Sequence, residues 1–240
     1  MKDTFDSYRE TFSDMFDLPM RTLIVGKSDL TGKTTYIGNL ILRDTYYRKL
    51  FKGANIYIVC TSMDFDEKWQ TIVEMKKIPE ENIMRKFDED KLRSIYNKLK
   101  NEYIEAVSNG EKPVHSLIIF DDCTSGELKS KKGGVLDDIA QIGRHALISF
   151  ILTVQKYTSI STLCREQCNG AVLFFCTPKQ RDLIGEDHNY LEDKKDFATM
   201  LRKHTSAKHH HLIVKYGGET EKNVTYFNRD WEPIDVVIHT

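Results

Sequence analysis

The chain has 240 residues, of which 40% are hydrophobic and 30% charged, and its formal net charge is −1. This is the composition of a globular protein, and the length suits one α/β domain or two small ones. A charge near zero does not indicate nucleic-acid binding by the whole surface, so any basic contact must be local. The acidic N-terminus and the lack of a long apolar run exclude a secretory signal and a membrane span. We expect an intracellular protein with no membrane partner.

The first 19 residues are predicted to form a helix, because an apolar stripe recurs at helical spacing before Pro19. Such a stripe can pack on its own domain or dock as an arm on a neighbouring subunit, and the sequence leaves both open. The members of the stripe are Phe5, Tyr8, Phe12, Met15 and Phe16.

Five short runs rich in Val, Ile, Leu and Phe follow, with helical patterns between them. Runs without polar alternation suit strands that are buried on both faces of a parallel sheet, and strand–helix alternation favours an α/β fold. The predicted strands are residues 21–26, 55–61, 116–122, 147–155 and 171–177. The predicted helices are residues 33–50, 89–107, 135–145 and 190–204.

The end of the chain changes character. Two apolar segments, 210–217 and 223–230, are separated by the sequence GETEK, which predicts an antiparallel hairpin at one edge of the sheet. No repeat or linker interrupts the chain. We therefore expect one domain over residues 1–240, with an N-terminal helix (1–19), a core (20–187) and a C-terminal helix and hairpin (188–240).

Cysteine and histidine residues give little support for a metal centre. The five cysteines lack zinc-ribbon spacing and are interpreted as buried, reduced thiols. The run from His209 to His211 opens an apolar segment and has no acidic residue or cysteine beside it, which also argues against a metal.

The segment VGKSDLTGKTT (25–35) resembles a phosphate-binding loop. The usual pattern is Gly, four residues, then Gly-Lys-Ser/Thr, but here the first glycine is Gly26, one residue early, and Lys27 stands at its place. The loop follows a predicted strand and opens a helix, as phosphate binding requires. The predicted nucleotide-binding residues are Gly26, Lys27, Ser28, Asp29, Leu30, Thr31, Gly32, Lys33, Thr34 and Thr35.

Within this loop, we expect Lys33 to reach the β- and γ-phosphates of ATP and the Thr34 hydroxyl to bind Mg²⁺. The run LIIFDD ends in two acids at the carboxyl end of a strand, where like charges favour a bound cation. We assign Asp121 to the Mg²⁺ site and Asp122 to polarising the attacking water. If the strand that ends at Gln155 lies between the loop strand and the LIIFDD strand, Gln155 points at the γ-phosphate.

Four blocks now stand in order: the GK…GKT loop, LIIFDD, IGRHALISFILTVQ and CREQCNGAVLFF. Together, over residues 20–187, they resemble the poxvirus-type genome-packaging ATPases of large DNA viruses and virophages, in the FtsK–HerA superfamily. The resemblance implies a RecA-like sheet, Mg²⁺-dependent ATP hydrolysis and a homo-oligomeric ring, a pentamer or hexamer, that drives double-stranded DNA into a capsid. It also implies capsid proteins as partners and a location in the host cytoplasm, a viral factory or the virion.

Such rings complete each site with an arginine from the next subunit, which stabilises transition-state charge. Arg144 and Arg165 are the candidates, and the resemblance favours Arg144. For DNA, the segment ELKSKKGG (127–134) follows the acidic strand, so Lys129, Lys131 and Lys132 could contact phosphates in a central pore. A solvated surface loop is the alternative interpretation of this charge run.

The leading hypothesis is thus an oligomeric ATP-driven DNA translocase. One alternative is a small-molecule or nucleotide kinase on the same type of fold, although no insert resembles a kinase lid. The other is a nucleotide-gated assembly protein with little turnover, which the longer loop keeps open.

Overall fold

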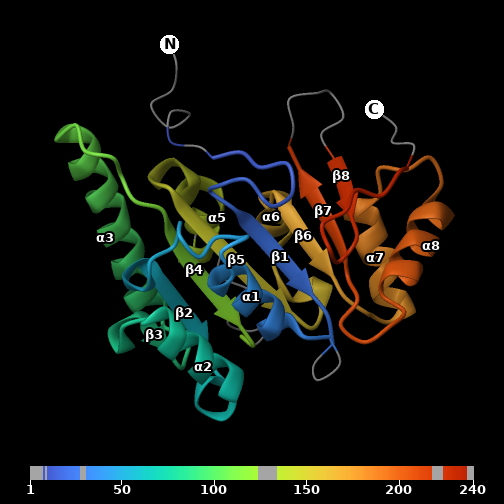
Figure 1. The fold of residues 1–240 in the computed structure, drawn as a ribbon, viewed down its shortest axis with the longest axis horizontal. Coiled ribbons are helices and arrows are strands. Elements are labelled where there is room, and N and C mark those ends of the chain that lie inside the picture. Colours follow the sequence, from blue (N-terminus) through green and yellow to red (C-terminus); the bar gives the residue numbers. More distant parts are fainter. Residues whose placement is uncertain (1–7, 9, 28–30, 124–133, 218–223, 237–240) are drawn as a thin grey trace.

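Each of the five apolar runs forms a strand of one eight-stranded sheet (Figure 1). The computed structural model describes residues 8, 10–27, 31–123, 134–217 and 224–236. In spatial order the strands are β3 (Ile83–Met84), β2 (Ile56–Cys60), β4 (Ser116–Asp121), β5 (Ile148–Val154), β1 (Arg21–Val25), β6 (Gly170–Leu173), β7 (Leu212–Tyr216) and β8 (Val224–Phe227).

Strands β1 to β6 all run parallel to one another. Strand β7 is antiparallel to β6, and β8 is antiparallel to β7. The prediction of a mainly parallel sheet with an edge hairpin is therefore confirmed. Because β1, β4 and β5 run the same way, their carboxyl ends meet at one edge of the sheet (Figure 1). Residues that follow these three strands are brought together there, although they lie far apart in the sequence.

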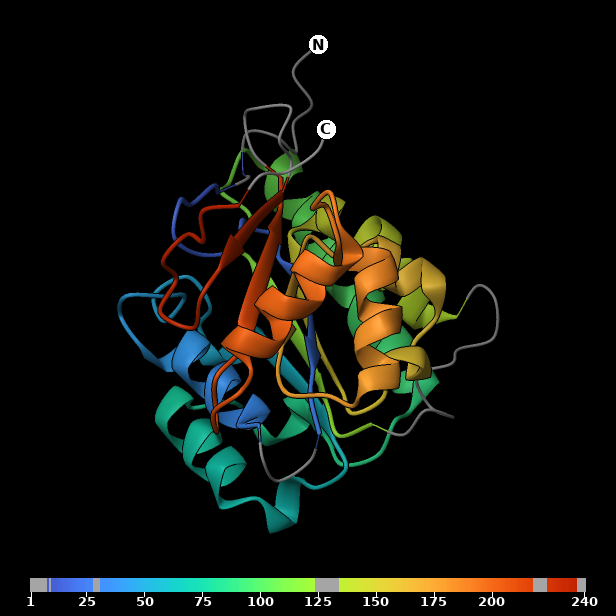
Figure 2. The same cartoon turned by 90° about the vertical axis from the view of Figure 1, so that its right-hand side faces the viewer.

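Helices cover both faces of the sheet, as the side view in Figure 2 shows. On one face, α1 (Lys33–Leu42) and α2 (Glu67–Lys76) pack with the N-terminal segment into one apolar core. The second core, on the other face, is formed with α3 (Glu89–Ser108), α5 (Val135–Ile142), α6 (Thr162–Glu166), α7 (Pro178–His188) and α8 (Lys194–His204). None of the helices that the structure describes has the length and apolarity needed to span a membrane.

Three predicted helices prove shorter than their patterns, and the one predicted over 190–204 begins at Lys194, after the cap residue Asp193. The first, predicted over 33–50, ends at Leu42 because Arg43 is extended, with a φ of −85° and a ψ of 137°. The chain then turns back, and the Tyr47 amide donates to the Leu40 carbonyl at 2.9 Å. The second, predicted over 135–145, ends at Ile142 and continues as a short 3-10 helix, η5 (Gly143–Ala146).

The predicted N-terminal helix is wrong for residues 10–19. This segment folds back on itself, and Glu10 and Leu18 form an antiparallel bridge. The Asp17 carboxylate accepts the Phe12 amide at 2.9 Å, so a side chain takes a donor that a helix would use. The Lys215 ammonium on β7 pairs with Asp17 at 2.9 Å in the interior. This described part of the stripe therefore packs on its own chain.

Candidate active site

The described residues that follow β1 bind the ammonium group of Lys33. Lys33 Nζ donates to the carbonyl oxygens of Gly26, at 3.0 Å, and Lys27, at 3.2 Å. The Thr31 hydroxyl donates to the same Lys27 carbonyl at 2.7 Å. Gly32 precedes α1 with a φ of 82°, a left-handed conformation that favours glycine. A lysine and a helix N-terminus thus meet at the loop, which is the arrangement that binds phosphate.

The early glycine has a packing role. The Gly26 amide donates to the Val154 carbonyl at 3.0 Å, which extends the contact between β1 and β5 by one residue. A Cβ on Gly26 would lie 2.8 Å from the Cβ of Phe174, too close for any other residue without a shift. Gly26 therefore permits the close approach of the chain that follows β6, while Gly32 provides the turn into α1.

Asp121 ends β4 as a buried carboxylate with three partners. Its side chain is only 3% exposed. Its Oδ2 accepts from Trp69 Nε1 at 2.6 Å and from the Thr34 hydroxyl at 3.3 Å, and the Thr153 hydroxyl donates to its Oδ1. Burial raises the pKa of Asp121, while the bonds from Thr153 and Trp69 and the charge of Lys33 lower it. A buried carboxylate in this setting is a site for positive charge.

Asp122 and Gln155 lie side by side, because the strand order on which the role of Gln155 depends is met. Strand β5 is indeed between β1 and β4, and Gln155 Nε2 donates to Asp122 Oδ1 at 3.2 Å. Asp122 has a left-handed backbone, with a φ of 54°, and its carbonyl accepts the Thr61 hydroxyl at 2.8 Å. The exposed Asp122 side chain lies next to the Gln155 amide, and Asp122 lines the same two cavities as Lys33.

The oxygen atoms here suit a hard divalent cation. Mg²⁺ prefers one or two carboxylates and hydroxyl oxygens and retains several waters. The Thr34 hydroxyl and Asp121 Oδ2 are 3.3 Å apart, and both residues line one cavity together with Asp122. The residues that the sequence predicts for Mg²⁺ therefore fit it.

Two cavities meet at Lys33 and Asp122. One, of about 270 Å³, is also lined by Thr31, Gly32 and Thr34. The other, of about 310 Å³, extends toward Gln155. A hollow of about 440 Å³ beside α8 is larger but includes none of the predicted site residues, so its size does not make it the active site. Thr35 lies exposed in the first turn of α1.

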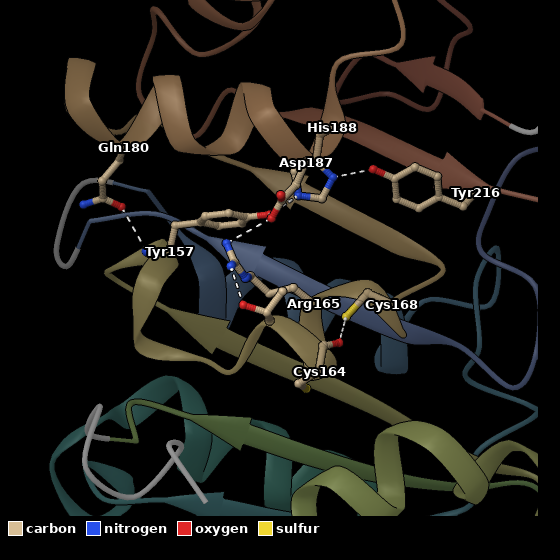
Figure 3. Close-up of polar contacts among 9 residues, drawn as sticks. Tyr157, Cys164, Arg165, Cys168, Gln180, Asp187, His188 and Tyr216 are labelled. Carbon is tan, nitrogen blue, oxygen red and sulfur yellow. Dashed lines mark hydrogen bonds and ion pairs between the residues drawn. The ribbon is translucent and has the colours of Figure 1, made fainter. Parts of the chain in front are cut away.

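The guanidinium of Arg165, on α6, is bound within its own chain (Figure 3). It pairs with Asp187 at 2.9 Å, lies 4.6 Å from the centre of the Tyr157 ring, and its side chain is 15% exposed. The Tyr157 hydroxyl donates to Asp187 at 2.7 Å, so the nearby His188 Nε2, at 2.9 Å, must donate to Tyr157. His188 Nδ1 then accepts from Tyr216. Arg165 thus ends a hydrogen-bonded chain that runs through the exposed Asp187 to the buried Tyr157 and His188.

Arg144 is placed differently. It lies in η5, before the amino end of β5, and is therefore at the opposite edge of the sheet from its own phosphate loop. Its side chain is half-buried and its Nε is 3.4 Å from His145 Nε2. Neither arginine lines the two cavities at Lys33.

Comparison with known proteins now decides the family. The family model described as Poxvirus A32 protein matches residues 8–230. The chain belongs to the poxvirus A32 protein family. Among the curated proteins, none matches this A32-family chain.

Solved structures show the same fold. The genome packaging NTPase B204 from Sulfolobus turreted icosahedral virus 2, in complex with AMPPCP, is 15% identical with a TM-score of 0.56, over 87% of this chain and 96% of that chain. B204, the DNA-packaging ATPase from Sulfolobus turreted icosahedral virus, is 14% identical with a TM-score of 0.53, over 87% of this chain and 97% of that chain. The pCW3 conjugation coupling protein TcpA is 14% identical with a TM-score of 0.52, over 95% of this chain and 69% of that chain.

Some residues at the site of the A32-family chain had no sequence signal. Trp69, from α2, donates a hydrogen bond to Asp121. Phe65 is 90% exposed and lines the cavity that Asp121 also lines. His209 lies against the phosphate loop, because a Cβ on Gly32 would be 2.7 Å from its Nδ1. The histidine run drew attention only as a possible metal site, yet His211 packs among aromatic rings.

Two sets of predicted residues lie outside the described part of the chain. They are Ser28, Asp29 and Leu30 of the phosphate loop and the lysines Lys129, Lys131 and Lys132. Their roles stay predictions.

Proposed function

We propose that this chain is a Mg²⁺-dependent ATPase that drives double-stranded DNA into a viral capsid. The observation that carries the proposal is the order β4-β5-β1, which sets Gln155 3.2 Å from Asp122 beside Lys33. A phosphate loop, a buried carboxylate and an amide–carboxylate pair at adjoining cavities are the groups that phosphoryl transfer to water needs. Membership of the A32 family and the fold shared with B204 support the same proposal.

Binding of ATP starts from the loop. The amides at the start of α1 and the Lys33 ammonium bind the β- and γ-phosphates, and Lys33 exchanges its bonds to the Gly26 and Lys27 carbonyls for phosphate oxygens. Mg²⁺, when held by Thr34 and Asp121, neutralises charge on those oxygens. The cavity beside Asp121 and Asp122 leaves room for the γ-phosphate.

Hydrolysis is assigned to the pair on β4 and β5. Gln155 donates its Nε2–H to Asp122, and its Oε1 accepts a hydrogen bond from the attacking water. The water oxygen forms a bond to the γ-phosphorus as the bond to the ADP oxygen breaks, and Asp122 accepts the water proton. The aspartate side chain is one methylene shorter than a glutamate, but Asp122 lines the cavity that Lys33 and Gln155 also line, which supports this role.

We further propose that the chain works as a ring of five or six copies. Arg144 is the better candidate for insertion into the next subunit, because Arg165 is engaged by Asp187 and Tyr157 in its own chain. Lys129, Lys131 and Lys132 would contact DNA phosphates in the pore. The ring would act with capsid proteins in the host cytoplasm, a viral factory or the virion.

Phosphate release from ATP, with duplex DNA and Mg²⁺ but no small-molecule acceptor, tests the proposal. We expect steady release by the wild type and by Lys49→Ala, an exposed lysine outside the site, and no release by Lys33→Ala. Nucleotide binding without turnover in the wild type would instead favour a nucleotide-gated assembly protein. Phosphate transfer that needs an added acceptor would favour a kinase.

A further inference from the structure

A buried tryptophan on α2 holds the carboxylate that ends β4. Trp69 lies in the first turn of α2 and is 0% exposed. An indole has one polar group, its N–H, which must find a partner when it is buried. Here Trp69 Nε1 donates to Asp121 Oδ2 at 2.6 Å, the shorter of the two bonds that this oxygen accepts. Trp69 therefore reaches the same oxygen that faces Thr34.

The Asp121 carboxylate is fixed from two directions. The indole holds Oδ2 from the face of the sheet that carries α2, and the Thr153 hydroxyl on β5 holds Oδ1. Rotation of the carboxylate about its Cβ–Cγ bond would break both contacts. Loss of Trp69 leaves Oδ2 with the longer bond to Thr34 alone.

Helix α2 is itself held firmly at this point. Asp66 caps it, since its Oδ1 accepts the Lys68 amide at 2.9 Å. One turn beyond Trp69, Ile72 packs closely on Gly38 of α1, where a Cβ would lie 3.0 Å from Ile72 Cδ1. The same helix α1 carries Thr34, so both partners of Asp121 Oδ2 come from one packed pair of helices.

We propose that Trp69 is a positioning residue for the Mg²⁺–nucleotide site. Its indole N–H orients the Asp121 carboxylate toward the cation. The inference rests on the proposed function, because it assigns Mg²⁺ to Thr34 and Asp121. Partners that orient a metal-binding carboxylate typically contribute about 10–100-fold to metal affinity. The alternative is a tryptophan that serves packing alone.

A matched pair of substitutions separates these two roles. Trp69→Phe removes the N–H but keeps a buried ring. Trp231→Phe makes the same change at the other tryptophan, which is 6% exposed and whose indole nitrogen is buried with no hydrogen-bond partner among the described residues. The readout is the Mg²⁺ concentration that half-saturates binding of a non-hydrolysable ATP analogue. We expect it to rise about 10–100-fold in Trp69→Phe and to stay unchanged in Trp231→Phe. Binding of the analogue in EDTA should be equal in both.

A second readout does not depend on the Trp69→Phe substitution. In Trp231→Phe, Trp69 is the sole tryptophan of the chain, so its emission reports on the Asp121 contact. Mg²⁺ with the analogue should change that emission, and Asp121→Asn should abolish the change. If Trp69→Phe does not fold, benzothienylalanine at position 69, which replaces N–H by sulfur in a ring of the same shape, gives the Mg²⁺ comparison.

Equal Mg²⁺ dependence in the wild type and in the variants at position 69 would overturn the positioning role and leave the proposed function intact. A wild type that binds the analogue without any Mg²⁺ dependence would also overturn the positioning role, whereas failure of the proposed function would appear as absent phosphate release from ATP.

Discussion

Asp122→Asn isolates the charge of the residue that we assign to water activation. The backbone of Asp122 is left-handed, with a φ of 54°, and asparagine tolerates this conformation better than most residues. Its amide oxygen can still accept the bond from Gln155, and the contact between Thr61 and the carbonyl at 122 involves only the main chain. The variant should therefore fold and bind ATP as the wild type does.

The expected loss is confined to turnover. A positioned general base contributes roughly 10²–10⁴-fold to a rate, so phosphate release should fall by about that factor in Asp122→Asn. Asp122→Ala should lose turnover as well and in addition unfold more easily, by roughly 1–2 kcal/mol, because alanine is strained in the left-handed region. The assay is phosphate release at saturating Mg²⁺–ATP, beside nucleotide binding by calorimetry. Turnover of Asp122→Asn within a few-fold of the wild type would refute the assignment.

Three further predictions concern strain, acid stability and the ring. Gly32→Ala should lower the free energy of unfolding, measured in urea, by roughly 1–2 kcal/mol, because alanine is strained at a φ of 82°. Adding His209→Ala should remove only the clash with the histidine ring. Full recovery of stability in the double variant would therefore contradict the backbone strain. Burial lowers the pKa of His188 from 6.5 to about 4, so the unfolded chain takes up the proton first. The contribution of His188 to stability should then fall by up to ~3 kcal/mol from pH 6.5 toward pH 4. An equally steep loss of stability in His188→Gln would contradict this contribution. In the assembled ring, Arg144→Ala should reduce ATP turnover at least tenfold. If Arg165→Ala reduces turnover and Arg144→Ala does not, Arg165 would be the arginine that enters the site of the next subunit.

The sequence predicts the parts of this molecule that depend on short stretches of chain. Apolar runs reveal the strands because each strand is buried on both faces. The loop, the acid pair and Gln155 are visible as motifs at the ends of those strands. The prediction that they meet depends on β5 lying between β4 and β1, which is a property of the whole sheet and is confirmed.

Contacts between distant segments explain what the sequence missed. Phe12 and Phe16 have helical spacing, but Asp17 takes the Phe12 amide and pairs with Lys215 from the far end of the chain. Trp69 carries no motif, because its role exists only where α2 packs beside β4. The odd spacing of Gly26 likewise follows from a distant neighbour, Phe174 in the chain that follows β6, which no local pattern records.

Displacement of a triplex-forming oligonucleotide from duplex DNA tests the central claim, movement of DNA driven by ATP, most directly. We expect the wild-type chain to release the third strand with ATP and Mg²⁺, but neither with a non-hydrolysable analogue nor with Lys33→Ala. Hydrolysis of ATP at the same rate with and without DNA, with the third strand left in place, would contradict the account.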